Sequence, residues 1–166
     1  MPSPKPIVYV DANVVIEAHR AGCWRTFIAR YDVRTTRECW RELGRGDPRD
    51  SDYVPVDTTA LASEVVVCDV TTSMLATAIT RAPSCAMIHR GERELLAWVA
   101  AQSGEVLLMT TADRAAVKSA CRLGLDTRLI SLEELAERSG CRPALRSWFC
   151  KRWLSQVKTE VLLEDF

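Results

Sequence analysis

The chain has 166 residues, and its 22 lysines and arginines balance its 22 aspartates and glutamates. This length suits one domain with a full hydrophobic core. The zero net charge gives no overall attraction to nucleic acid or to an anionic membrane, so any such binding needs a local basic patch. The sequence has no apolar run long enough to cross a membrane and no signal peptide, which predicts a cytoplasmic protein without membrane contact.

The seven cysteines are odd in number and widely spaced, and no Cys-x-x-Cys pair occurs. Several stand where a small hydrophobic residue would, as Cys68 does in the stretch 65–70. We therefore expect buried, reduced thiols rather than disulfides. The two histidines are far apart in the sequence, which argues against a zinc site.

The first predicted element is an apolar strand, Ile7–Val10, which runs directly into Asp11. An unbroken apolar strand is typical of a parallel sheet covered by helices on both faces. Asp11 then stands at the carboxyl end of the strand, where open α/β sheets bind their ligands. Aspartate is also a good helix N-cap, so position alone explains Asp11 equally well as the start of a helix at Ala12.

Predicted strands and helices alternate along the rest of the chain, with short connections and no internal repeat. The predicted strands span 7–10, 31–35, 65–70, 106–110 and 127–130. The predicted helices span 12–21, 24–30, 36–43, 60–64, 72–81, 91–103, 112–123 and 131–138, followed by a terminal helix with Pro143 in its first turn. The polar stretch 44–52, which contains Gly and Pro, is predicted to be a loop. This alternation indicates a three-layer α/β/α fold with a central, mostly parallel sheet of four to five strands.

A second aspartate, Asp113, follows the apolar strand 106–110 and opens the next helix, much as Asp11 follows the first strand. Helix capping is again the simplest alternative role. Since neighbouring parallel strands end at the same edge of a sheet, we expect these two carboxylates to lie close together.

Two glutamates on predicted helices are candidates for the same place. Glu42 lies on or beside the helix face that Cys39 helps to bury, where a carboxylate is rare unless it is paired or bound to a metal. Glu92 lies in the first turn of helix 91–103, in phase with its apolar side, although it could instead stabilise the helix dipole. Carboxylates in one pocket repel each other unless a cation neutralises them. Oxygen-only ligands suit Mg²⁺ or Mn²⁺, which can activate water and support charge on a phosphoryl group.

The order and spacing of these motifs resemble those of PIN-domain nucleases, in particular the VapC-like prokaryotic branch. The resemblance spans roughly residues 7 to 135 and is carried by Val10–Ile16, Glu42-Leu43, His89–Ala97 and Thr111–Ala116 with Leu123–Leu125. It implies a PIN-like α/β fold and a metal-dependent endoribonuclease that cleaves single-stranded RNA and leaves a 5′-phosphate and a 3′-hydroxyl.

The resemblance also implies roles for individual residues. Its acids match Asp11, Glu42, Asp113 and either Glu92 or Glu94 as ligands of Mg²⁺ or Mn²⁺; helical phase favours Glu92. Its small polar positions, which orient water, match Asn13 and Thr111. Basic residues flank two of the acids and are predicted to hold RNA phosphates, or else to line an ordinary solvated helix face. They are Arg90, Arg93, Arg114 and Lys118.

The expected domain organisation is a flexible leader at 1–6, a catalytic domain at 7–140 and a C-terminal helical extension at 141–166. One side of the terminal helix carries Leu145, Trp148, Phe149 and Trp153. We expect it to pack on the domain or on a dimer mate, with RNA binding through its basic residues and an exposed tryptophan as the alternative. The acidic-apolar end, 160–166, is predicted to be frayed or to contact a partner.

Many small members of the prokaryotic branch are toxins, so an antitoxin partner is a further expectation. The stretch 44–56 and the terminal helix depart from the compact toxins. Three other functions stay open: an inactive PIN fold that binds RNA or protein, a phosphatase with Asp11 as nucleophile, and a response-regulator receiver. The phosphatase usually has a second aspartate where this chain has Asn13, and the receiver needs an acidic pair that this chain lacks.

Overall fold

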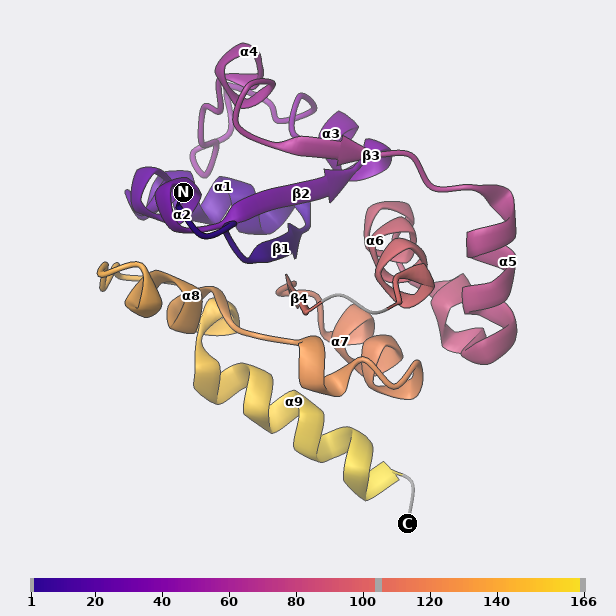
Figure 1. The fold of residues 1–166 in the computed structure, drawn as a ribbon. Coiled ribbons are helices and arrows are strands. Elements are labelled where there is room, and N and C mark those ends of the chain that lie inside the picture. The colour runs from indigo at the N-terminus through magenta and orange to yellow at the C-terminus, as the bar shows by residue number, and fades with distance from the viewer. Residues whose placement is uncertain (1, 104–105, 165–166) are drawn as a thin grey trace.

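The computed structural model describes residues 2–103 and 106–164, and its centre is a four-stranded, all-parallel sheet in the order β3-β2-β1-β4 (Figure 1). The strands are β1 (Ile7–Val10), β2 (Asp32–Thr36), β3 (Val66–Cys68) and β4 (Leu107–Thr110). Strand β1 pairs with β4 so that Val10 lies opposite Thr110. The predicted α/β fold is confirmed, and the two aspartates do follow neighbouring parallel strands.

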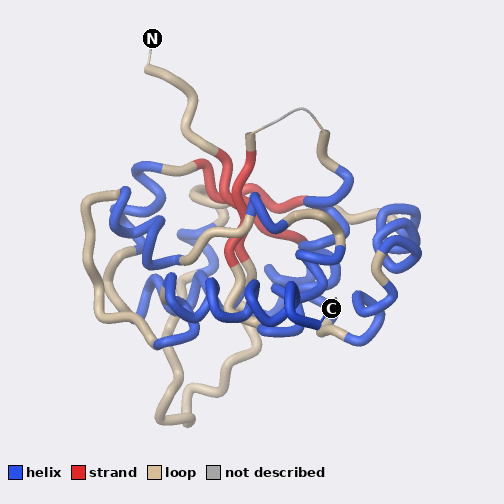
Figure 2. The backbone as a smooth tube through the Cα atoms, turned by 90° about the horizontal axis from the view of Figure 1, so that it is seen from below, coloured by secondary structure: helices blue, strands red, loops and turns tan. Residues whose placement is uncertain are grey.

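Helices flank the sheet, which lies at the centre of the molecule in Figure 2. They are α1 (Ala12–Arg20), α2 (Trp24–Arg30), α3 (Arg37–Glu42), α4 (Thr58–Leu61), α5 (Thr72–Arg81), α6 (Arg90–Ala101), α7 (Arg114–Arg122), α8 (Leu132–Arg138) and α9 (Lys151–Glu164). Short 3₁₀ turns occur at η1 (Pro83–Met87), η2 (Asp126–Arg128) and η3 (Ser147–Phe149).

Successive side chains of β1 enter two different hydrophobic cores, because strand side chains alternate between the faces of a sheet. Val8 and Val10 belong to the core that contains residues of α1, α2 and α8. Tyr9 belongs to the core that contains residues of α6, α7 and α9. The sheet is therefore the middle of three layers.

The predicted strand at 127–130 is wrong. Residues Asp126–Arg128 turn as η2, and only Leu129 makes a bridge, to Met109 beside β4. Because Asp126–Arg128 form a 3₁₀ turn, they cannot also pair in a strand, and the bridge from Leu129 to Met109 is the one that forms at this described segment. Two smaller differences concern the loop after α3, which continues to Asp57, and α4, which starts at Thr58 rather than at residue 60.

The predicted start of the terminal helix is also wrong, since the helix begins at Lys151 and not near Pro143. Tertiary contacts hold the preceding segment in an irregular conformation. The backbone N–H of Arg146 donates to Glu17 at 2.9 Å, and the carbonyl of Ala144 accepts from Arg20 at 3.0 Å. These bonds to α1 replace those that a helical turn would make.

The described part of the C-terminal end is helical rather than frayed. Helix α9 continues to Glu164 and packs beside α7 and α8. Its residues Leu154, Val157 and Val161 are buried, and Leu154 and Val157 belong to the second core. Residues 165–166 of the predicted frayed end lie outside the described residues.

The structure bears on two expectations, the absence of a membrane-spanning segment and the state of the cysteines. None of the described helices is long and apolar enough to cross a membrane. All the cysteines are free thiols, and Cys23, Cys39, Cys68 and Cys85 are buried as expected. The remaining Cys121, Cys141 and Cys150 are only half-buried.

Candidate active site

Asp11 is fully buried where β1 passes into α1. Its Oδ1 accepts a hydrogen bond from the backbone N–H of Val14 at 2.9 Å, so Asp11 is the N-cap of α1. Its Oδ2 accepts a hydrogen bond from the hydroxyl of Thr111, beyond the end of β4, at 2.5 Å. Asp11 therefore caps a helix and also joins two neighbouring strand ends.

Asp113 repeats this arrangement at the start of α7. Its Oδ1 accepts from the backbone N–H of Ala116 at 2.7 Å. Its own backbone N–H donates to the Thr111 hydroxyl at 3.2 Å. The hydroxyl of Thr111 thus links Asp11 to the backbone of Asp113. Its predicted role in orienting water stays a prediction.

Glu92 lies in the first turn of α6, and its residue is only 5% exposed. Its Oε2 is buried and has no hydrogen-bond partner among the described residues. Burial raises the pKa of this carboxyl, and the nearby Asp113 raises it further. A buried carboxylate oxygen without a donor is costly to maintain, and either a proton or a cation at this oxygen would lower that cost.

Glu42 approaches the same place from the end of α3. A Cβ atom on Gly91 would lie 2.7 Å from Oε1 of Glu42, so the carboxylate fills space that only glycine leaves open at the start of α6. Partial burial raises the pKa of Glu42, and the neighbouring Glu92 and Glu38 raise it further.

The buried position of Asp11 raises its pKa to about 7, and its neighbours Glu92 and Asp113 add to that effect. Hydrogen bonds from Thr111 and Val14 act in the opposite direction but are weaker than burial. The N-termini of α1, α6 and α7 meet near these acids, and helix N-termini favour negative charge. Among the described residues, His89 and Arg45 lower the pKa of Glu42, and His89 lowers that of Glu92, but burial outweighs them.

Across residues 2–103 and 106–164, no three Asp, Glu, His or Cys side chains are gathered tightly enough to hold a metal ion as they stand. The chemistry of the group nevertheless fits a hard cation. Its donors are all oxygens, the pKa values of Asp11, Glu42 and Glu92 are raised, and Glu92 Oε2 lacks a partner. The metal stays a prediction.

Glu94, the alternative to Glu92, is directed elsewhere. Its carboxylate accepts a hydrogen bond from the backbone N–H of Glu38 at 3.2 Å, in the first turn of α3. Glu94 therefore stabilises the contact between α6 and α3. This contact favours Glu92 as the acid of the site.

The predicted water-orienting residue Asn13 is exposed in the first turn of α1. It lies at a pocket of about 220 Å³ that Asp113 also lines. Trp148 and Arg146, from the segment before α9, complete part of the wall. This pocket brings the predicted site residues next to the C-terminal part of the chain.

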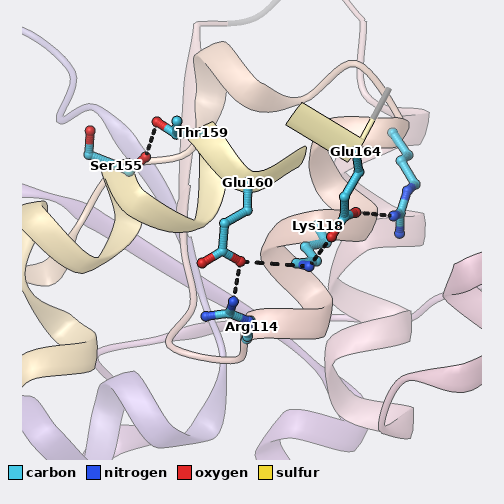
Figure 3. Close-up of polar contacts among 7 residues, drawn as sticks. Arg114, Lys118, Ser155, Thr159, Glu160 and Glu164 are labelled. Atoms are coloured by element: carbon cyan, nitrogen blue, oxygen red, sulfur yellow. Dashed lines mark hydrogen bonds and ion pairs between the residues drawn. The ribbon is translucent and has the colours of Figure 1, made fainter. Parts of the chain in front are cut away.

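Three of the four predicted phosphate-binding residues already have partners within the protein. The guanidinium of Arg93 donates to the carbonyls of Cys85, Ala86 and Ile88 at 2.8–3.0 Å. Figure 3 shows that Arg114 pairs with Glu160 on α9, and that Lys118 lies between Glu160 at 3.7 Å and Glu164 at 2.5 Å. The acids of α9 thus neutralise the basic side of α7.

The fourth residue, Arg90, belongs to an arginine cluster that the sequence did not reveal. The carboxylate of Glu38, with the residue only 5% exposed, lies 3.3 Å from Arg41, 3.8 Å from Arg45 and 3.8 Å from Arg90. Three guanidinium groups thus share one buried carboxylate. Arg45 also lowers the pKa of Glu42, and Arg41 lowers that of Asp69. The helical spacing of Glu38, Arg41 and Arg45 is a local signal, but the approach of Arg90 is visible only in the fold.

No family model matches the chain, and no curated protein matches its sequence.

Proposed function

We propose that this protein is a metal-dependent endoribonuclease that cleaves phosphodiester bonds in single-stranded RNA. One observation carries the proposal. Besides the larger effect of burial, Glu92 and Asp113 raise the pKa of Asp11, and Asp113 raises the pKa of Glu92. Glu92 also keeps a buried oxygen that has no hydrogen-bond partner among the described residues. The motifs around these acids are those that resemble PIN-domain nucleases.

The acids that would hold Mg²⁺ or Mn²⁺ are Asp11, Glu42, Glu92 and Asp113. When bound, the ion supplies the charge that offsets the carboxylates, polarises the phosphodiester and lowers the pKa of water. Thr111 fixes the orientation of Asp11 by donating to Oδ2. Because the pKa of Asp11 is about 7, a cation competes with a proton there, and metal affinity should rise with pH through neutrality.

The arginine cluster around Glu38 supports an anionic substrate. Arg41, Arg45 and Arg90 are 55%, 65% and 68% exposed in their side chains, and their shared partner Glu38 is buried. Exposed guanidinium groups that share one buried carboxylate suit the phosphates of a nucleic acid backbone. Glu42 is on the same helix as Glu38, so the cluster stands beside the acids.

The test is cleavage of a pool of single-stranded RNA with Mn²⁺ present, comparing the wild type with Asp11→Asn. We expect the loss of activity to be at least about 100-fold, above the effect usual for a residue that merely supports a site. Glu137→Gln, which changes an exposed acid on α8, is the matched control and should cleave like the wild type. Equal activity in wild type and Asp11→Asn contradicts the proposal.

An inactive fold that only binds RNA or protein is the second candidate, because the described acids do not already form a three-ligand cluster. Isothermal titration with Mn²⁺ separates the two. The enzyme should bind Mn²⁺ with an affinity that Glu92→Gln weakens strongly, whereas the inactive module should show no carboxylate-dependent binding. An antitoxin partner and a homodimer stay predictions.

A further inference from the structure

We infer that the pocket between α1, the start of α7 and the segment before α9 binds one unpaired base of the RNA, with Trp148 as the stacking platform and Arg146 as the phosphate contact. The inference rests on the proposed function, from which it takes RNA as the ligand. It assigns a binding role to residues outside the stretch that resembles PIN-domain nucleases.

The pocket lies next to the acids of the candidate active site. Asn13 and Asp113 form part of its wall, and Asp113 is itself one of the four acids. A ligand in the pocket therefore touches the edge of the candidate active site. A nucleotide next to the scissile phosphate would occupy this place.

The size of the pocket suits one base. Its volume is about 220 Å³, below the roughly 300–1,000 Å³ of pockets that enclose a drug-sized ligand. A base can enter it only when unpaired and turned out of a helix. The pocket would therefore favour single-stranded RNA over duplex RNA, because sequence and strand recognition in RNA depend on bases that are free to splay out.

Trp148 has an aromatic side chain that is partly open to solvent. It is 44% exposed, whereas the next residue, Phe149, is buried in the core and 5% exposed. The two rings are 6.3 Å apart at 43°, so Trp148 packs beside the buried Phe149. A partly exposed indole at a pocket is suited to stacking on a base.

Arg146 supplies positive charge with spare hydrogen-bonding capacity. Its Nε lies 3.9 Å from Glu17, and its side chain is 39% exposed. The carboxylate of Glu17 accepts hydrogen bonds from the guanidinium of Arg20, at 2.5 and 2.8 Å, and from the backbone N–H of Arg146. The guanidinium of Arg146 is thus held at the pocket by a long ion pair and can donate to a phosphate.

The experiment measures binding and cleavage separately. Binding of a labelled single-stranded oligoribonucleotide is followed by fluorescence anisotropy in an Asp11→Asn background, which prevents cleavage. The added variants are Trp148→Ala, Trp148→Phe and Arg146→Gln, with Val106→Ala as the control. Val106 is an exposed apolar residue beside the opposite, amino end of β4. Each variant is also tested with an abasic ribose-phosphate chain of the same length, and thermal melting checks the fold.

We expect Trp148→Ala to bind the oligoribonucleotide about 5- to 100-fold more weakly, as for other stacking aromatics. Trp148→Phe should keep most of the affinity, and Val106→Ala should keep all of it. The loss in Trp148→Ala should vanish with the abasic chain, because no base is left to stack. Arg146→Gln should weaken binding of both chains.

Equal affinity of Trp148→Ala and Val106→Ala for the oligoribonucleotide overturns the inference. A protein ligand is then the alternative occupant of the pocket. The same loss with and without bases also overturns it. If the wild type fails to cleave RNA while base-dependent binding through Trp148 is observed, the inference stands and only the nuclease proposal fails.

Discussion

Asp11 combines two properties that conflict in the free protein. It accepts hydrogen bonds that favour its charged form, and it is buried where charge is unfavourable. Burial is the larger effect, so its pKa is raised to about 7. At neutral pH without a cation, the carboxyl is therefore held near the midpoint of its titration. A residue in this state stabilises the fold less than a neutral amide of the same shape would.

Because of this conflict, we expect the stability of the folded protein to decrease as the pH rises. Since the folded pKa is about 7 and the ordinary value is 3.8, the folded state keeps its proton to higher pH than the unfolded state does. The contribution of Asp11 to stability is complete below about pH 4 and is lost as pH rises through 7. In EDTA at pH 7.5, we expect Asp11→Asn to unfold with a free energy about 1–3 kcal/mol higher than the wild type.

Urea unfolding from pH 4 to pH 8 checks this expectation. The difference between Asp11→Asn and wild type should grow across that range. Parallel stability curves would show that Asp11 ionises normally in the folded protein. Since Asn is also a good N-cap, its amide oxygen can still accept from the N–H of Val14, but its NH2 group cannot accept from the Thr111 hydroxyl as Oδ2 does. That loss does not depend on pH, so the change in the difference across the pH range reports the titration.

Pairs of helices, rather than single residues, decide where positive charge is available. On the α7 side, Glu160 and Glu164 of α9 pair with Arg114, Lys118 and Arg122. On the side of α3 and α6, one buried carboxylate faces three arginines. Anionic ligands should therefore approach the acids along α3 and α6. The chain's zero net charge conceals this asymmetry.

The asymmetry can be measured through the salt dependence of RNA binding. Arg45→Gln should weaken binding and reduce the slope of log affinity against log salt by about 0.7, as for the loss of one phosphate contact on a single strand. Arg122→Gln is the matched control, because Glu164 already neutralises Arg122 at 3.0 Å, and its slope should stay unchanged. Equal losses in both variants would contradict a cluster-specific contact.

Most elements were predictable because their signals are local. Apolar runs mark β1 and β4, and Ser131 is a residue type that caps helices; it accepts a hydrogen bond from the N–H of Glu134 at the start of α8. The terminal helix was misplaced because Glu17, distant in sequence, binds the backbone at Arg146 and stabilises an irregular segment there. The placement of Asp11 beside Asp113 followed from parallel pairing, whereas the burial of Glu38 under arginines depends on packing between α3 and α6.

At the scale of the whole molecule, α9 completes the second core. Val157 is fully buried together with residues of α6 and α7, so the expected separate extension at 141–166 shares its apolar contacts with the part of the chain that carries the acids. A helix that seals a core should unfold together with it. The C-terminal segment is then part of the unit that positions the acids.

Substitutions on the buried and the exposed side of α9 test whether this helix unfolds together with the rest of the domain. Val157→Ala should lower the free energy of unfolding by about 1–3 kcal/mol, since it removes buried methyl groups. Leu163→Ala, at a residue that is 69% exposed, should change it by less than about 0.5 kcal/mol. Denaturant unfolding followed by both tryptophan fluorescence and circular dichroism should give one transition. Two separate transitions would mean that α9 is an independent unit.

The hydrogen bond between Thr111 and Asp11 joins residues that are 100 positions apart. At a translation rate of about 5–20 residues per second, the strand that brings Thr111 is made roughly 5 to 20 seconds after Asp11. Strands β1, β2 and β3 can pair during that interval, but the acids cannot gather until β4 joins β1. Under the proposed function, this delay would keep the acids apart while the messenger is still being translated.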